Sequence, residues 1–471
     1  MNLNKPLAHT LLATALMTAL SGCSFQPHYQ RPALPVADQW QQPADTTTGK
    51  AASDIAWNEF FRDSDMRQLI SLALANNRDL KVAALNVESA RAQYQITGAD
   101  LMPSVGAELS KTAEHLPGGL YSTQSTGPVT YQQYQGDLAV SSWELDFWGR
   151  IRSLRDQSLE QYLADQSTQQ ATRISLIAEV AQAYITLSAD SDLEKVAQQT
   201  AASQTKSLSI ANTRYRAGSA SQQDVLQAET TVKSAEADVQ MYQRQKQQAL
   251  NALALLVGTR LPAGIAQHAT LQKSWFFPPL NAGLPSQVLT RRPDIIAAEH
   301  TLKAANANIG AARAAFFPTI SLTASGGSMS GGLSQLFDGG TGAWSFVPSI
   351  NLPIFEGGRN RAQLDVAKIS KRIDIANYEK AIQQAFKEVS DALIGEQTYQ
   401  REIVSRHDDL TVNQKYYQLA QLRYQTGVDD YLQVLTAQRS LYSAQQTYIS
   451  VLASSLNQQV TLYKVLGGGW Q

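Results

Sequence analysis

Apolar side chains occupy every second position over a short segment in the second half of this chain. They are Trp344, Phe346, Pro348, Ile350 and Leu352, and the positions between them are polar except for Val347. A period of two residues is typical of a strand with one apolar face. This pattern predicts a strand at about 343–354, and similar segments predict strands at about 103–114, 131–145 and 319–325, with a Gly-rich loop from Gly326 to Gly340.

A period of seven residues predicts long, coiled helices elsewhere. After residue 224, two seam positions recur, and Lys246 is the one residue that is not apolar or small. The first seam holds Val225, Val232, Val239, Lys246 and Leu253, and the second holds Ala228, Ala235, Tyr242, Ala249 and Leu256. Helices with this spacing pack side by side, and the alanines allow close approach. An ordinary core helix is the alternative interpretation.

The two halves of the chain repeat each other. The segment Arg214-Tyr215-x-x-Gly218 returns 209 residues later as Arg423-Tyr424-x-x-Gly427. Each copy ends a helical segment that would reach about 90 Å, from Ile151 to about Tyr215 and from Arg359 to about Tyr424. A duplicated element of this size defines the architecture, so we expect two copies of one unit instead of three unrelated domains.

These patterns divide the chain into six parts. They are a signal peptide (1–22), an extended segment (23–61), a first repeat (62–258), a crossover (259–293), a second repeat (294–467) and a C-terminal tail (468–471). Each repeat is expected to hold a helix, two strands and a long helical hairpin, with tips near 214–224 and 423–433. The first of these helices is expected from Arg62 to about Ala99. The fold class is therefore mixed α and β with an internal duplication.

The first 23 residues have the pattern of an export signal. Lys5 precedes an apolar run from Leu7 to Leu20, which is too short to span a bilayer as a mature helix. The run ends at Leu20-Ser21-Gly22-Cys23, which resembles a bacterial lipoprotein signal and implies an N-acyl and S-diacylglycerol lipid on Cys23. Cys23 is the only cysteine, so no disulfide can form within one chain. The alternative is an ordinary signal peptide with a chance cysteine.

Composition and motifs argue against several classes of function. The formal net charge is −1 and the isoelectric point is about 6.6, which gives no electrostatic reason to expect a nucleic-acid partner. The six histidines are isolated, no nucleophile motif is present, and the Gly-rich loops do not lie between a strand and a helix in a phosphate-binding arrangement. We therefore expect no enzyme activity, no metal site and no cofactor apart from the lipid on Cys23.

Four strands per chain are too few for a membrane barrel, which needs at least about eight. An open sheet edge in lipid would leave backbone groups unpaired, at a cost of several kcal/mol each. The strands therefore predict an oligomer in which several chains close one wall and the attached helices close a tube beneath it. The alternative is a lipid-anchored periplasmic coiled-coil scaffold without a pore, with the strands as surface hairpins.

Four segments resemble those of a known family: Trp143 to Arg150, Arg291 to Asp294, Ala304 to Pro318, and Gly467 to Trp470. They are similar to the outer-membrane efflux channels of Gram-negative bacteria, the TolC family, and to its lipoprotein branch that includes OprM and CusC. The similarity covers essentially the whole mature chain. It implies a homotrimer with a 12-stranded outer-membrane β-barrel continuous with a periplasmic α-barrel of long coiled helices.

The resemblance also implies a function and its partners. The chain would be the exit duct of a tripartite efflux pump, anchored in and spanning the bacterial outer membrane and extending into the periplasm. It would dock to a periplasmic membrane-fusion adaptor and to an inner-membrane transporter of the RND type. The expected cargo is drugs or other small toxic solutes. Heavy-metal ions and polypeptides are alternative cargoes, although six Met and six His without clustering give no thioether or imidazole ladder.

The resemblance places the closed end of the duct and its adaptor contact at the two hairpin tips. The candidate residues there are Arg214, Tyr215, Gly218, Asp224, Arg423, Tyr424, Gly427, Asp429 and Asp430. The family's two gate aspartates would fall six and nine residues after Gly427, where this chain has Gln433 and Thr436. Asp224, in contrast, matches an acidic position of the family's first repeat.

A structural role for the same tip residues is the simpler interpretation. Gly218 and Gly427 suit the left-handed residue that ends a helix. Asp224 lies three residues after Ser221, and Asp430 three before Gln433, as in helix caps. Capping and gating are compatible, so both interpretations stay open at this point.

Overall fold

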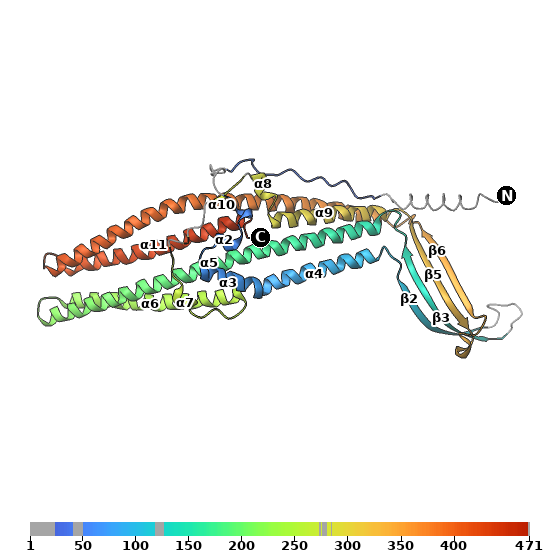
Figure 1. Cartoon of the computed structure of the whole chain (residues 1–471), viewed down its shortest axis with the longest axis horizontal. Coiled ribbons are helices and arrows are strands. Elements are labelled where there is room, and N and C mark those ends of the chain that lie inside the picture. The colour runs from blue at the N-terminus through green and yellow to red at the C-terminus, as the bar shows by residue number, and fades with distance from the viewer. Residues whose placement is uncertain are drawn as a thin grey trace. The chain divides into compact units, whose positions relative to one another are not determined.

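The computed structural model describes residues 24–40, 50–117, 127–272, 275, 280–283 and 285–469. Within them the chain forms two units, whose elements are labelled in Figure 1. Unit 1 draws on residues 1–32, 87–165 and 298–378, and unit 2 on residues 33–86, 166–297 and 379–471. The predicted signal peptide (1–22), Cys23 and Trp470 lie outside the described residues.

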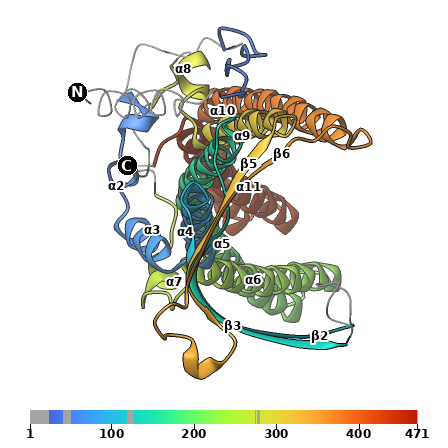
Figure 2. The same cartoon turned by 90° about the vertical axis from the view of Figure 1, so that its right-hand side faces the viewer.

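Unit 1 contains a four-stranded antiparallel sheet, with two strands from each repeat. Its strands are β2 (Val105–Leu116), β3 (Val129–Glu144), β5 (Thr319–Ser330) and β6 (Gly342–Asn351). The order across the sheet is β2-β3-β5-β6, so the two repeats meet where β3 pairs with β5 (Figure 2). Among the described strands, β2 and β6 each pair on one side only and are therefore the edge strands of the sheet.

The strand β5 is longer than the sequence pattern indicated. We expected it to end at Ser325 and a loop to begin at Gly326, which is wrong, because β5 continues through Gly327 to Ser330. A Cβ atom at position 327 would lie 2.1 Å from the carbonyl oxygen of Gly136 on β3. Glycine is therefore needed at position 327 for the close approach of two strands, a use of glycine that differs from a turn.

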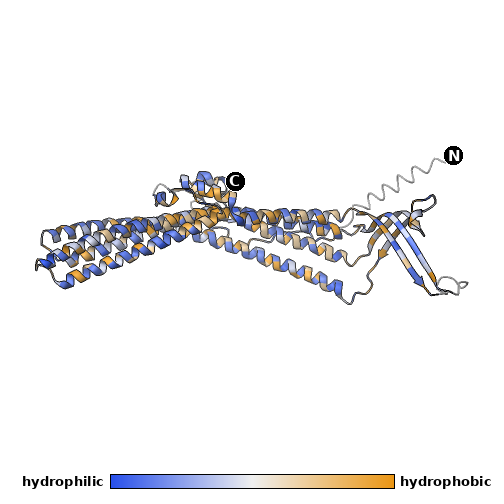
Figure 3. Cartoon of the chain, turned by 90° about the horizontal axis from the view of Figure 1, so that it is seen from below, coloured by the Kyte–Doolittle hydropathy of each residue, from blue (hydrophilic) through white to orange (hydrophobic). Residues whose placement is uncertain are grey.

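Unit 2 contains most of two long helical hairpins. The first consists of α5 (Arg150–Arg216) and α6 (Gln222–Val257), and the second of α10 (Arg359–Gln425) and α11 (Tyr431–Val465). Both α5 and α10 have 67 residues and contribute to both units. Figure 3 shows apolar positions interleaved with polar ones along these helices. No helix within the described residues combines the length and apolarity that a bilayer crossing requires.

The predicted heptad seams form the packed side of α6. Ala228, Val232, Ala235, Tyr242 and Leu253 are all buried. Lys246, the exception in the pattern, places its Nζ 3.0 Å from a carboxylate oxygen of Glu194 on α5. The charged seam position is thus satisfied by an ion pair with the neighbouring helix.

The first predicted helix is interrupted, so the expectation of one continuous helix from Arg62 to Ala99 is wrong. The chain forms α3 (Ser64–Asn76) and α4 (Arg78–Ala99), with Asn77 between them. The Asn77 side-chain oxygen accepts a hydrogen bond from the backbone N–H of Leu80 at 2.9 Å, and its Nδ2 donates to the carbonyl oxygen of Leu256 at 2.9 Å. Asn77 thus caps a new helix, as asparagine commonly does.

The crossover contributes short elements to unit 2. They are α7 (Ile265–His268), β4 (Leu280–Asn281) and α8 (Pro285–Leu289). The strand β4 pairs in parallel with β1 (Lys50–Ala51). The next helix along the chain is α9 (Pro293–Ala314), most of which belongs to unit 1.

The short helix α2 (Trp57–Phe60) contributes to an aromatic cluster in unit 2. Phe60 stacks on Tyr463 with ring centroids 3.9 Å apart, and the Tyr463 hydroxyl donates to the carbonyl oxygen of Ile55 at 2.7 Å. This cluster fixes the end of α11 to the start of unit 2.

Candidate functional site

Both hairpin tips end their long helix with the same left-handed glycine. Gly218 has φ 72° and Gly427 has φ 76°. In each tip the residue after the glycine donates its N–H to the carbonyl oxygen of the arginine five residues before it. The two bonds, each 2.9 Å long, are Ser219 to Arg214 and Val428 to Arg423. The repeated Arg-Tyr-x-x-Gly motif is therefore, first of all, a helix-ending signal of the Schellman type.

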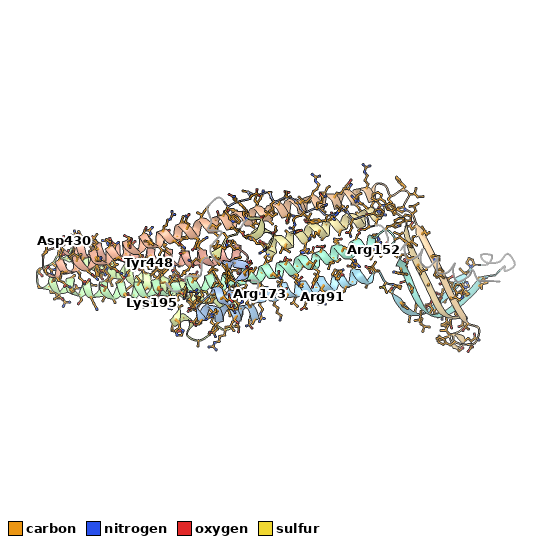
Figure 4. The ribbon with its side chains drawn as sticks, turned by 45° about the horizontal axis from the view of Figure 1, so that its top comes forward. Arg91, Arg152, Arg173, Lys195, Asp430 and Tyr448 are labelled. Carbon is orange, nitrogen blue, oxygen red and sulfur yellow. The ribbon has the colours of Figure 1, made fainter. Side chains whose placement is uncertain are left out.

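Two of the three candidate gate aspartates cap the returning helices. Asp224 and Ser221 form a capping box, with the backbone N–H of each bonded to the side chain of the other at 2.9 and 3.2 Å. Asp430 accepts a hydrogen bond from the backbone N–H of Gln433 at 3.2 Å. Figure 4 shows Asp430 at the turn between α10 and α11. Each cap satisfies an N–H group that a helix start leaves unpaired.

The third aspartate forms an ion pair within its own tip. Arg423 donates from Nε to one carboxylate oxygen of Asp429 at 2.6 Å and from Nη2 to the other at 2.9 Å. The hydrogen bond from Arg423 lowers the pKa of Asp429. Two parallel hydrogen bonds fix the orientation of both side chains more than one would. Asp429 is therefore ionised and already paired at neutral pH.

The tip of the first repeat contacts the tip of the second. The guanidinium carbon of Arg214 lies 5.0 Å from the ring centroid of Tyr424, within the range of a cation–π interaction. The Tyr424 ring also contacts Tyr431 on α11, with centroids 5.4 Å apart. Tyr215, the counterpart of Tyr424 in the first repeat, is exposed. The duplicated tips are thus alike in backbone but different in side-chain contacts.

Further from the tips, polar side chains connect α6 to α11. The Tyr442 hydroxyl donates to Asp238 at 3.0 Å, and Gln446 Nε2 donates to the Tyr242 hydroxyl at 2.9 Å. Burial and the hydrogen bond to Asp238 raise the pKa of Tyr442. The seven-residue period placed Tyr242 on a seam, but it did not predict these pairs. The sequence held a weak signal for them. Asp238 and Tyr242 on α6 are four residues apart, as are Tyr442 and Gln446 on α11, so each two residues share one helix face.

Within the described residues, the half-buried carboxyl group of Glu396 on α10 has no cation beside it. Gln400 Nε2 donates to Glu396 Oε1 at 2.7 Å, and Gln459 Nε2 lies 3.5 Å from the same oxygen. Burial raises the pKa of Glu396, and the two amides only partly offset that effect. No sequence pattern singled out Glu396, because its environment is formed in part by a segment more than 60 residues away.

The sheet of unit 1 has one apolar and one polar face. Paired residues of antiparallel strands share a face, so the register assigns every side chain to one side. The apolar face includes Val105, Leu109, Leu138, Trp344, Phe346 and Ile350, each at least 59% exposed. Exposed apolar area of this extent on one face marks a surface that is covered in the working state of the protein.

The polar face brings two carboxylates together. Glu108 on β2 lies directly opposite Asp137 on β3, and the next position across the sheet is Gly327 on β5. Asp137 accepts a hydrogen bond from Gln135 Nε2 at 2.8 Å. Like charges placed opposite each other are unfavourable in a sheet unless water or cations screen them. This face therefore suits an aqueous surface with a preference for cations.

Acidic side chains gather at the two tips, as they do in many metal sites and catalytic sites. Within the part of the chain that the structure describes, no group of three or more His, Cys, Asp or Glu could hold a metal ion. The three aspartates at the tips are engaged in two caps and an ion pair. The arrangement is therefore suited to holding helices in place.

Comparison with known proteins places the chain among bacterial efflux proteins. The family model described as outer membrane efflux protein matches residues 69–259 and 284–468. The toluene efflux pump outer membrane protein TtgC and the antibiotic efflux pump outer membrane protein ArpC, both of Pseudomonas putida, are each 47% identical over 465 residues, covering 98% of this chain and 95% of theirs. The open-state MtrE outer membrane channel of Neisseria gonorrhoeae superposes with a TM-score of 0.86 at 37% identity, covering 95% of this chain and 99% of that one.

Proposed function

The chain belongs to the outer membrane efflux protein family and is an outer-membrane channel of a tripartite efflux pump, and we propose that three copies join edge to edge to form its wall. The sheet carries this proposal, because β2 and β6 present unpaired edges 12 and 10 residues long. An unpaired edge is costly in lipid, whereas pairing β6 of one copy with β2 of the next removes it. Three sheets of four strands give a closed wall of 12 strands.

The two faces of the sheet support the same arrangement. In a closed wall the apolar face with Trp344 and Ile350 contacts lipid, and the polar face with Glu108 and Asp137 faces water. Alternation of this kind is the pattern of membrane strands around an aqueous path. The non-pore scaffold is less consistent with it, because a surface hairpin would leave the apolar face in water.

The hairpins of unit 2 then supply the periplasmic part of the duct. We place the narrow end at the two tips, where Arg214 contacts Tyr424 and Arg423 pairs with Asp429. The caps at Asp224 and Asp430 make the tip backbones rigid, so opening would separate packed helices without melting their ends. The duct has no energy source of its own. An inner-membrane transporter of the RND type, connected through a periplasmic adaptor, supplies the energy for transport.

The cargo that we propose is small apolar or amphipathic toxic solutes. Two relatives that match nearly the whole chain are named for toluene and for antibiotic efflux. A heavy-metal cargo has less support, since no ladder of Met, His or Cys occurs in the sequence. Deleting the gene should therefore increase susceptibility to solvents and antibiotics and leave susceptibility to copper and silver unchanged. Increased susceptibility to copper and silver alone would favour metal export. If no susceptibility changes, polypeptide secretion becomes the favoured function.

Planar-bilayer recording tests the pore itself. Purified protein should run as a heat-labile trimer on gels and conduct ions in single-channel steps. The Cys23→Ser variant, extracted from the membrane in detergent, serves as a control for the lipid, because the wall is formed by the sheet and not by the anchor. Protein that stays monomeric and passes no ions would exclude the channel and favour the scaffold.

A further inference from the structure

The described residues after Cys23 lie along unit 1 in a continuous series of specific contacts. Phe25 stacks on Phe317 with centroids 4.5 Å apart and 16° between the rings, and Trp148 stacks on the other rings at 4.9 and 6.4 Å. Trp148 and Phe317 belong to the junctions that connect β3 to α5 and α9 to β5. The segment thus begins at the point where two of the four strand–helix connections of the sheet meet.

The backbone of the segment is bound at two points by α9. Arg313 Nη1 donates to the carbonyl oxygen of Phe25 at 3.0 Å, and Asn306 Nδ2 donates to the carbonyl oxygen of Pro27 at 2.8 Å. Bonds from side chains to the main chain hold an extended peptide without any secondary structure of its own.

A glycine in α9 provides the space for this segment. A Cβ at Gly310 would lie 2.6 Å from Cγ of Gln26, 2.7 Å from Oγ of Ser153 and 3.0 Å from the backbone nitrogen of Gln26. Gln26 also donates from Nε2 to Asp156 at 3.0 Å. Glycine inside a helix lowers helix propensity relative to alanine, so its presence here has a packing reason.

The far end of the segment is held by a buried carboxylate. Glu299, whose side chain is 8% exposed, accepts hydrogen bonds from Arg31 Nε at 3.0 Å and Nη2 at 2.7 Å, and from the Tyr29 hydroxyl at 3.2 Å. Burial alone would raise the pKa of Glu299, but the hydrogen bond from Arg31 and the charge of Lys303 hold it below its ordinary value. Removing Arg31 would leave the buried carboxylate with the Tyr29 hydroxyl and with Lys303, whose Nζ lies 3.4 Å away.

We propose that residues 24–31 form a strap that holds the lipid-bearing terminus against the two strand–helix junctions and thereby sets the depth of each copy in the membrane. This inference rests on the proposed channel and on acylation of Cys23. Two peptide units separate Cys23 from Phe25, so covalent geometry keeps the Cα atom of Cys23 within about 7 Å of the Cα atom of Phe25, whose ring lies in the aromatic stack. The junctions then lie at the inner surface of the outer membrane, where aromatic residues are favoured.

The strap has a consequence for assembly. Pairing β6 of one copy with β2 of the next requires the two edges to be in register, and an error of one residue exchanges the apolar and polar faces. Copies held at one depth approach each other with their edges already level. The strap therefore favours the correct register before any strand pairs.

A pair of glycine substitutions tests the strap. Gly310→Ala inserts a methyl group into the space that Gln26 occupies. Gly98→Ala in α4 is the matched control, since the added Cβ would lie 4.0 Å from its nearest neighbour, Cδ of Arg155. Both changes raise helix propensity, but the methyl group at position 310 also meets Oγ of Ser153 on α5, so a second variant has to separate displacement of the strap from displacement of α5. Phe25→Ala removes the stack without altering any helix and serves if Gly310→Ala fails to fold.

The readouts are chymotrypsin cleavage after Tyr29, which separates a palmitate label from the body of the protein, and the temperature at which trimers dissociate on gels. We expect Gly310→Ala and Phe25→Ala to be cleaved about tenfold faster than the Gly98→Ala control, because cleavage follows the population of the released strap, and their trimers to dissociate at a lower temperature. Cleavage at the control rate, or faster cleavage with unchanged trimer stability, would overturn the proposal. Wild-type protein that resists chymotrypsin but passes no ions would instead contradict the proposed channel.

Discussion

Arg214 and Tyr424, 210 positions apart in the chain, meet with the guanidinium carbon of one 5.0 Å from the ring centroid of the other. The contact joins the first tip to the second. The equivalent residues under the repeat, Arg423 and Tyr215, interact differently. Tyr215 is exposed, and Arg423, the counterpart of Arg214, binds Asp429 instead. The hairpins are therefore connected asymmetrically at their ends, in addition to the polar pairs further along α6 and α11.

The Arg214 contact should restrain opening of the tips. Arg214→Ala and Tyr424→Leu should each increase single-channel conductance, and the double variant should match either single one, because all three remove the same interaction. A double-mutant cycle on unfolding should give a coupling free energy of about 0.5–1 kcal/mol, as for cation–π pairs near a surface. Additive effects on conductance would show that the two residues act separately.

The aspartates of the second tip should have different roles. Asp429→Asn should alter conductance or partner-dependent opening, as should Arg423→Gln, because either change breaks the bidentate pair. Asp430→Ala should cost about 1 kcal/mol of unfolding free energy through loss of the α11 cap. Unchanged single-channel behaviour in the Asp429→Asn/Asp430→Ala double variant would exclude both residues from the gate.

The pH dependence of the Arg423–Asp429 pair follows from the lowered pKa of Asp429. A carboxylate with a lowered folded-state pKa stabilises the folded tip above its unfolded value of about 4 and loses this contribution as the pH falls through the folded value. Conductance differences between wild type and Asp429→Asn should therefore persist from pH 7 down to about pH 4 and disappear in stronger acid. Recordings across this range provide the measurement, and a difference that vanishes near pH 6 would contradict the assignment.

Glu396 should show the opposite sign. Because burial raises its pKa, folding favours the protonated form, and the wild-type protein loses stability as the pH rises through the folded-state value. Glu396→Gln, which keeps the shape and the amide partners, should raise the unfolding temperature by a few degrees at pH 7 and match wild type at low pH. Thermal unfolding at both pH values tests this, with Glu236→Gln on the exposed face of α6 as the control.

The paired carboxylates of the sheet should influence ion selectivity. In the proposed wall, Glu108 and Asp137 face the aqueous path, with three copies of each. The Glu108→Gln/Asp137→Asn variant should lower the preference for cations, measured as a smaller reversal potential in a salt gradient. Low salt should enlarge the difference, since screening weakens surface charge. A reversal potential equal to that of wild type would place these residues away from the ion path.

Cys23→Ser should abolish acylation. Labelled palmitate should enter the wild-type protein and not the variant, and the variant should wash from membranes more readily while still forming trimers when concentrated. Incorporation of label into the variant would refute the lipid assignment.

The sequence specified much of the local structure because its signals are local. The two-residue period gave strands and a polar and an apolar face, and the seven-residue period gave helices whose seam residues, such as Ala228 and Leu253, are buried. The caps were also readable, because Ser221 and Asp224 lie three residues apart. Local reading failed at Asn77 and Gly327, where a distant segment determines the role of the residue.

Most of the candidate site depended on contacts between distant segments. Sequence alone marked Arg214, Tyr424 and Asp429 as tip residues, yet it could not determine that Asp429 pairs with Arg423 and that Arg214 contacts Tyr424. The duplication even argued for symmetric contacts, which the tips do not have.

The sequence by itself therefore determined the duplicated plan, the lengths of the hairpins and the two-sided strands, since these follow from periodicity and from caps within a few residues. Only the tertiary structure decided which charge meets which partner, as when Glu299 takes Arg31 from a segment 268 residues earlier. The physical reason is that burial and hydrogen-bond geometry depend on how segments far apart in the chain pack together. The pattern of residues along the chain does not specify which of these segments come into contact.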